Sequence, residues 1–82
     1  MTPELQRYYE NRLSMMGDKA WSDLLEDVAE MKKATDTVNG VKDMEQLFIR
    51  QGEIRIMDWI LNLKRISEEA YDNLKGEDEN PA

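Results

Sequence analysis

A stretch without proline, from residue 42 to residue 75, most constrains the fold of this chain, because nothing in it forces a helix to stop. In its middle, residues 51–63 (QGEIRIMDWILNL), seven of thirteen side chains are large and apolar. They recur at helical spacings and do not alternate as they would in a strand. Asp43 suits a first turn, Lys75 a last turn and Gly76 a C-cap, so the sequence predicts one helix over about 42–75, roughly 50 Å long.

The residues before this stretch predict two shorter helices. Thr2 followed by Pro3 is a typical helix start, and Gly17 is expected to end the first helix, over about 3–16, as a left-handed cap. Asp18 is expected to cap a second helix over about 19–38, which Asn39-Gly40 stops. Its apolar stripe is regular. The stripe consists of Trp21, Leu24, Leu25, Val28, Met31, Thr35 and Val38.

The fold class predicted from these patterns is all-α, with two shorter helices packed along one long C-terminal helix. By the rise per residue, the two shorter helices end to end match the long one in length. Residues 1–76 are expected to form a single helical domain. Residues 77–82 (EDENPA) are an acidic tail without an apolar anchor, which we expect to be mobile.

The long helix has apolar side chains on two faces. The broader stripe is expected to face the core, and it consists of Phe48, Ile49, Ile56, Trp59, Ile60, Leu63, Ile66, Ala70, Tyr71 and Leu74. Gly52 falls within this stripe. A glycine inside a helix costs about 1 kcal/mol relative to alanine, so it indicates either the close approach of a neighbouring helix or a kink near Gln51.

The second face is narrower and lies roughly opposite the first. Leu47, Ile54 and Leu61 recur every seven residues, with Met57 beside them, and a one-sided core does not require them. Such a heptad is typical of a coiled-coil-like contact, with charged neighbours that select the partner. The sequence therefore predicts a partner interface at these four residues. In the alternative interpretation, the two upstream helices straddle the long helix and cover both faces.

The composition removes most other ways to stabilise or use a short chain. Eighty-two residues bury a modest core, and small folds usually need disulfides, a metal or oligomerisation. The chain has neither cysteine nor histidine, so disulfides, the usual zinc sites and the common nucleophile systems are excluded. We therefore expect no enzyme activity, no cofactor and no metal, and we expect a homo-oligomer or a subunit of a larger complex.

The net charge of −7 argues against direct binding to nucleic acid or to an anionic membrane, since both need clustered basic residues. The polar N-terminus lacks the apolar region of a secretory signal, and the longest apolar run is three residues, so a cytoplasmic location is expected. The acidic side of the second helix, Asp23, Glu26, Asp27 and Glu30, is either a solvated face or a surface that imitates a nucleic-acid backbone.

Four segments carry a resemblance to a group of proteins. YYENRLSMMGDKAWSDLLEDV near the N-terminus, and later RQGEI with DWILNL and SEEAYDNL, resemble small, mostly uncharacterised helical proteins encoded by tailed bacteriophages. The resemblance covers about residues 2–74 and includes no catalytic signature. It implies a location in the host bacterial cytoplasm or in the virion. It carries over no functional residues.

These observations lead to two functional hypotheses. The first is a non-enzymatic protein–protein interaction module, a virion or assembly component that self-associates or docks on a larger phage or host protein. The alternative is an acidic phage-encoded inhibitor, of the anti-defence or DNA-mimic type, that binds a host enzyme or a nucleic-acid-binding protein.

Overall fold

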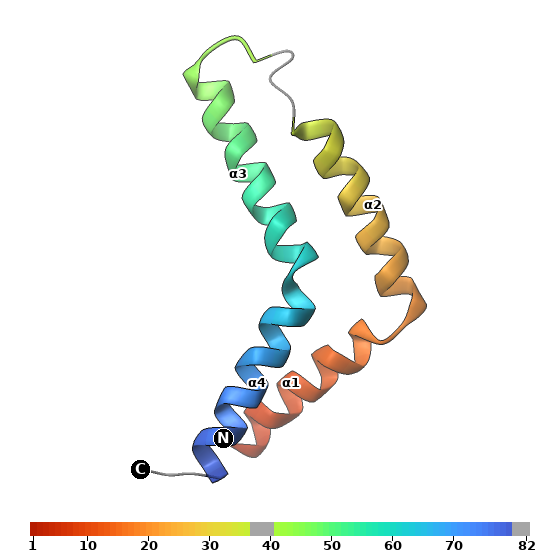
Figure 1. Ribbon diagram of the computed structural model, residues 1–82, viewed down its shortest axis with the longest axis vertical. Helices are drawn as coiled ribbons and strands as arrows, with labels where there is room; N and C mark the ends of the chain where they lie inside the picture. Colours follow the sequence, from red (N-terminus) through yellow and green to blue (C-terminus); the bar gives the residue numbers. More distant parts are fainter. Residues whose placement is uncertain (37–40, 80–82) are drawn as a thin grey trace. The chain divides into compact units, whose positions relative to one another are not determined.

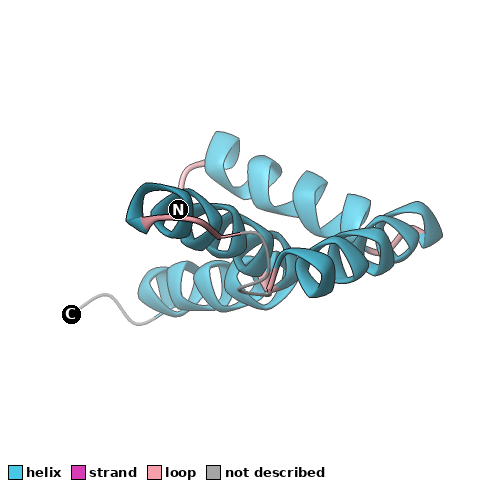
Figure 2. Cartoon of the chain, turned by 90° about the horizontal axis from the view of Figure 1, so that it is seen from above, coloured by secondary structure: helices cyan, strands magenta, loops and turns pink. Residues whose placement is uncertain are grey.

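The computed structural model describes residues 1–36 and 41–79 and has no strand within them (Figures 1 and 2). The chain is all-α in these ranges, but the predicted number of three helices is wrong. Four helices form: α1 (Pro3–Met16), α2 (Lys19–Thr35), α3 (Met44–Leu61) and α4 (Leu63–Glu79). The predicted stop at Asn39-Gly40 and the last three residues of the predicted tail lie outside the described residues.

The fourth helix arises because the predicted long helix is interrupted at Asn62. The Asn62 backbone N–H and its side-chain Nδ2 both donate to the carbonyl of Asp58, at 3.0 and 2.7 Å. An asparagine side chain that bonds to a nearby carbonyl competes with the regular helical pattern. The kink predicted near Gln51 does not occur, since α3 continues through Gly52. Gly76 is not a C-cap either, because α4 continues to Glu79.

Side-chain caps determine where three of the helices begin. Thr2, Asp18 and Asp43 precede α1, α2 and α3, and each accepts a backbone N–H from two or three residues further on, at 2.8–3.1 Å. Such caps satisfy amides that have no partner inside the helix. The predicted end of the first helix at Met16 is confirmed, but Gly17 is right-handed (φ −84°, ψ −8°), so its predicted left-handed conformation is wrong.

The chain forms two compact units, which are described separately. The first contains residues 1–22 and 63–82, and the second contains residues 23–62. Helix α2 contributes its first four residues to the first unit and the rest to the second. The predicted single domain over 1–76 and the mobility of the tail stay predictions.

In the first unit, α1 packs against α4. The residues that are most covered there are Met16, Leu63 and Ser67. The rings of Tyr9 and Tyr71 lie 6.2 Å apart, and the Tyr71 hydroxyl donates to a Glu10 carboxylate oxygen at 3.2 Å. The amino group of Met1 also pairs with the carboxylate of Asp78, so both ends of α4 are engaged.

Ser67 is the most buried side chain described, at 1% exposure, and its Oγ has no hydrogen-bond partner within the described residues. A buried hydroxyl without a partner destabilises a fold by about 1–3 kcal/mol, so we expect Ser67→Ala to raise the free energy of unfolding. We expect Ser67→Leu to lower it by about 1–3 kcal/mol through overpacking. Urea unfolding measures both, with the exposed Ser14→Ala as control. A loss of stability in Ser67→Ala would show that the hydroxyl has a partner in solution.

Candidate protein interaction surface

The second unit is a helical hairpin in which α2 and α3 run side by side in opposite directions (Figure 1). Between residues 23 and 35, the positions of α2 that are not exposed follow alternating spacings of three and four. On α3, five of the seven half-buried or buried positions follow the same rule, and the other two are Asp58 and Ile60. These nine residues form the inner face of the hairpin: Leu25, Val28, Lys32 and Thr35 of α2, with Leu47, Arg50, Ile54, Met57 and Leu61 of α3. Such spacing is typical of coiled-coil pairing.

The four residues predicted as a partner interface therefore lie on the inner face. Met57 is 8% exposed, and Leu47, Ile54 and Leu61 are half-buried. Within the described residues these four side chains are thus partly covered on the side of α3 that faces α2. The alternative interpretation, in which both upstream helices straddle the long helix and cover both of its faces, stays a prediction. The role of these four residues as an interface with another protein also stays a prediction.

The stripe predicted to face the core is largely exposed on α3. Phe48 and Ile56 are each 61% exposed and Trp59 is 50% exposed. At about 100° per residue, these side chains lie on the side of α3 opposite the inner face. We call this side the outer face. It consists of Met44, Phe48, Ile49, Gly52, Ile56 and Trp59.

Gly52 lies in the middle of the outer face. A methyl group added to Gly52 would meet nothing within 4 Å. Among the described residues, no neighbouring helix therefore makes the predicted close approach at this glycine. Gly52 leaves a shallow gap between Phe48 and Ile56, one helical turn away on either side.

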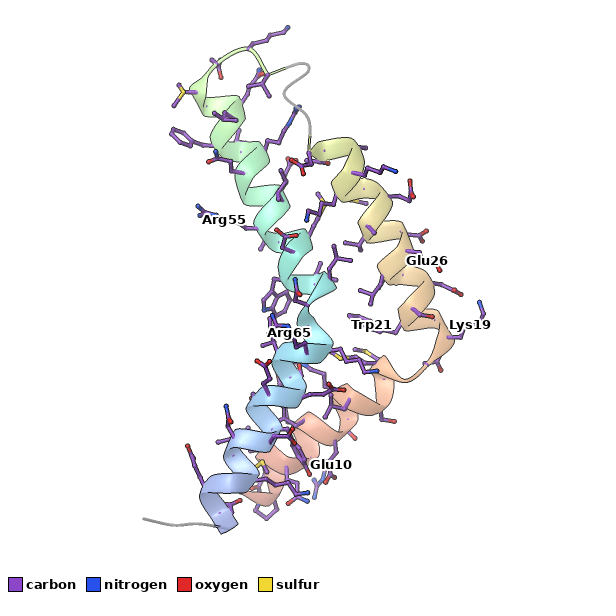
Figure 3. All side chains as sticks on the ribbon, in the orientation of Figure 1. Glu10, Lys19, Trp21, Glu26, Arg55 and Arg65 are labelled. Atoms are coloured by element: carbon purple, nitrogen blue, oxygen red, sulfur yellow. The ribbon has the colours of Figure 1, made fainter. Side chains whose placement is uncertain are left out.

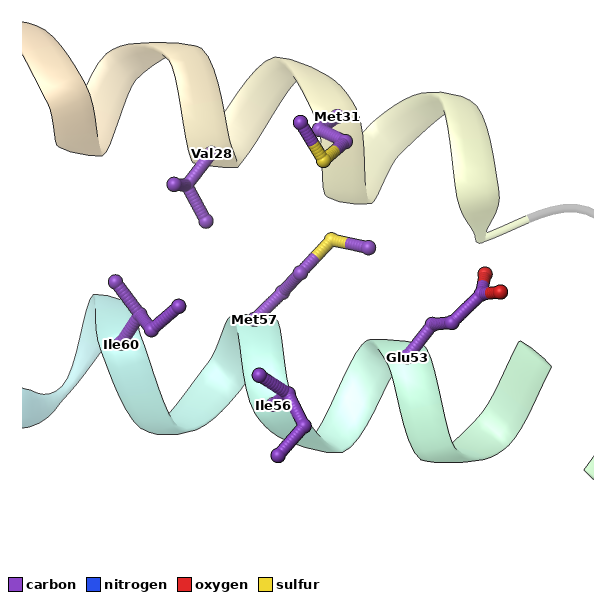
Figure 4. Close-up of a pocket in the computed structure, with 6 residues that line it drawn as sticks. All are labelled: Val28, Met31, Glu53, Ile56, Met57 and Ile60. Carbon is purple, nitrogen blue, oxygen red and sulfur yellow. The ribbon is translucent and has the colours of Figure 1, made fainter. Parts of the chain in front are cut away.

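One flank of the hairpin contains an open, apolar groove. It has a volume of about 420 Å³ and lies between α2 and α3 (Figure 4). Glu53 is the only charged residue among those that line it, and Ile56 belongs both to the groove and to the outer face. The lining residues are Val28 and Met31 of α2 with Glu53, Ile56, Met57 and Ile60 of α3. The apolar surface of α3 thus continues from the outer face into the groove.

An ion pair joins the two helices at the inner face. Lys32 Nζ lies 2.6 Å from Asp58 Oδ1. Both residues are half-buried. The hydrogen bond to Asp58 and the charge of that carboxylate raise the pKa of Lys32 above its ordinary value, and the charge of Asp36 adds to this effect. The pair fixes the one basic residue of the α2 inner face in the hairpin.

Because of this ion pair, the stability of the hairpin is expected to depend on pH in the alkaline range. Because the pKa of Lys32 is higher in the folded chain, its stabilisation is fully present below the ordinary pKa of 10.5 and is lost as the pH rises through the folded value. We expect the melting temperature of the natural chain to fall more steeply above about pH 10.5 than that of Asp58→Asn. The measurement is the difference in melting temperature between the two proteins at each pH. The titration of other groups affects both proteins alike and drops out of this difference. Parallel curves would contradict this prediction.

Two charged residues, Glu45 and Arg55, lie on the same side of α3 as the outer face and border its apolar side chains. Both are exposed, and neither takes part in an ion pair with another residue of the described ranges. Arg55 extends from α3 on the side away from α2 (Figure 3). The outer face is therefore neutral, although the chain has a net charge of −7.

The acidic residues of the alternative hypothesis are all on α2. Asp23, Glu26, Asp27 and Glu30 are exposed, and Glu26 points away from α3 (Figure 3). Within residues 1–36 and 41–79, no group of three or more acidic side chains is placed to hold a metal ion. The role of this surface in an inhibitor stays a prediction.

No described helix combines the length and the apolar character needed to cross a membrane. Comparisons with known protein families, with curated proteins and with solved structures gave no match. The resemblance to phage-encoded proteins is therefore still a prediction.

Proposed function

We propose that this chain is a non-enzymatic interaction protein that associates through the outer face of α3. The observation that carries the proposal is the exposure of five large apolar side chains opposite the face that pairs with α2. With aromatic side chains of about 150–250 Å² as a guide, half-exposed residues contribute on the order of 100 Å² each. The outer face thus presents about 500 Å² of apolar surface, as much as the largest patches on typical monomers, which are often functional.

The size of this surface fits a specific protein contact when the groove is included. A standard interface covers about 800 Å² on each partner, somewhat more than the outer face provides. The adjoining groove adds apolar surface to the outer face and brings the total closer to this area. Its contributing residues are Val28, Met31 and Ile60. The neutral charge of the outer face also favours its burial, since unpaired charges are costly to remove from water.

The proposed biological setting is a virion or an assembly intermediate of a phage. The sequence resemblance supports this setting, and the exposed apolar surface supports association with another protein. Binding is also the activity that suits a chain without histidine or cysteine, which lacks the side chains of most nucleophilic and zinc-dependent sites.

The absence of cysteine allows a direct test, because a single introduced thiol is the only one in the chain. We expect the thiol of Ile56→Cys to react quickly with a maleimide in dilute purified protein. In an extract of the cells that naturally produce the protein, it should react slowly, because a bound partner would cover the outer face. The thiol of Lys33→Cys, exposed on α2, serves as control and is expected to react equally in both. Equal reactivity of the Ile56→Cys thiol in the extract and in dilute solution would overturn the proposal.

A further inference from the structure

We infer that the partner on the outer face is a second copy of this chain, whose α3 packs antiparallel to the first about a two-fold axis at Gly52. This inference rests on the proposed function. In this arrangement Gly52 meets Gly52 of the second copy, and Phe48 meets Ile56 of the second copy on both sides of the axis. Antiparallel pairing of identical faces is self-complementary and closes as a dimer.

Gly52 is the first observation that points to this arrangement. A glycine in a helix interior is less favourable than alanine, and none of the described residues lies within 4 Å of a methyl group added at Gly52. A missing side chain in the centre of an apolar face lets another helix approach closely. On a two-fold axis, the same residue provides that space for both helices.

The charges of the outer face select the antiparallel direction. With a rise of about 1.5 Å per residue, antiparallel pairing about Gly52 places Glu45 roughly 6 Å along the axis from Arg55 of the second copy. Glu45 then lies about 20 Å along the axis from Glu45 of the second copy. In a parallel pair, each of these residues would face its own counterpart, and like charges would repel.

The groove supplies the remaining contact. Ile56 lines the groove, so Phe48 of the second copy arrives at its edge, where about 420 Å³ of apolar space is open. Each copy offers one groove and one phenylalanine, so the contact occurs twice. Filling both grooves raises the area buried on each copy towards the about 800 Å² of a standard interface.

Single cysteines test both the partner and the direction. Disulfides form only where the two Cα atoms come within about 7 Å. Under mild oxidation we expect Gly52→Cys to cross-link to itself, and Phe48→Cys to cross-link with Ile56→Cys when the two variants are mixed. Phe48→Cys alone should not cross-link beyond the level of the control, Lys33→Cys.

The possible outcomes separate this inference from the proposed function. Self-cross-linking of Phe48→Cys as efficient as that of Gly52→Cys would show parallel pairing, which overturns the inference but leaves association through the outer face in place. Cross-linking of no variant above the control, with slow maleimide labelling of the Ile56→Cys thiol in the native extract, would mean that another protein covers the face. That result also overturns the inference. Cross-linking in the expected pairs supports it.

Discussion

Replacing Ile54 and Leu61 together by glutamate is expected to unfold the hairpin of residues 23–62. Both side chains are half-buried on the inner face, so the change removes two apolar contacts and introduces two carboxylates. Complete burial of a leucine or isoleucine contributes about 1.5–3 kcal/mol, so the loss of contacts at two half-buried side chains amounts to roughly 1.5–3 kcal/mol. A small domain has a total stability of about 5–15 kcal/mol, and a buried charge without a partner adds to the loss.

Circular dichroism of dilute protein measures this effect as a loss of helical signal and of the cooperative melting transition. The matched control makes the same change on the other side of α3, in Phe48→Glu with Trp59→Glu. Because both of these side chains are at least half exposed, we expect the control to remain helical. If the control unfolded and Ile54→Glu with Leu61→Glu did not, the core would lie on the broad stripe, as the sequence alone predicted.

Features that depend on a few neighbouring residues could be predicted from the sequence. The caps at Thr2 and Asp18 were predicted because each requires only a side-chain oxygen and an amide two or three residues later. The end of the first helix at Met16 was predicted for a similar local reason. The all-helical character of the described residues followed from periodicity over many positions.

The face of α3 that packs within the chain could not be chosen by hydrophobicity alone. The outer face holds two aromatic side chains, whereas the inner face includes Arg50, so the more apolar stripe was predicted to be the core. Pairing between two helices instead depends on matched spacing. Lys32 and Thr35 of α2 follow the same alternation as Leu47 and Arg50 of α3, and this common spacing was present in the sequence.

The interruption at Asn62 was missed because only glycine and proline were treated as possible breaks in the long helix. Gly52 is accommodated within α3, whereas α3 ends before Asn62, whose side-chain Nδ2 shares the Asp58 carbonyl with the regular helical bond of its own backbone N–H. Asp58 also pairs with Lys32, so the end of α3 is held by contacts that involve α2. Such a combination depends on tertiary structure, and the local sequence around residue 62 does not reveal it.

The largest expected effect on association is that of Phe48→Glu with Trp59→Glu. Large aromatic side chains are frequent anchors of protein interfaces, and truncating such an anchor typically costs about 2–4 kcal/mol of binding free energy. Two anchors on each copy, replaced by charges of one sign, are expected to weaken dimerisation by more than about a thousandfold. The natural chain should therefore shift from monomer to dimer with rising concentration, while the variant remains a monomer throughout.

Light scattering across a concentration series measures this shift as solution mass. Tyr8→Glu with Met15→Glu is the matched control, because it places the same charges on exposed apolar positions of α1. The control should dimerise as the natural chain does, since its substitutions lie outside α3. A dimer in Phe48→Glu with Trp59→Glu would exclude the outer face as the contact between copies. A natural chain that stays monomeric at high concentration would instead assign the outer face to a different protein.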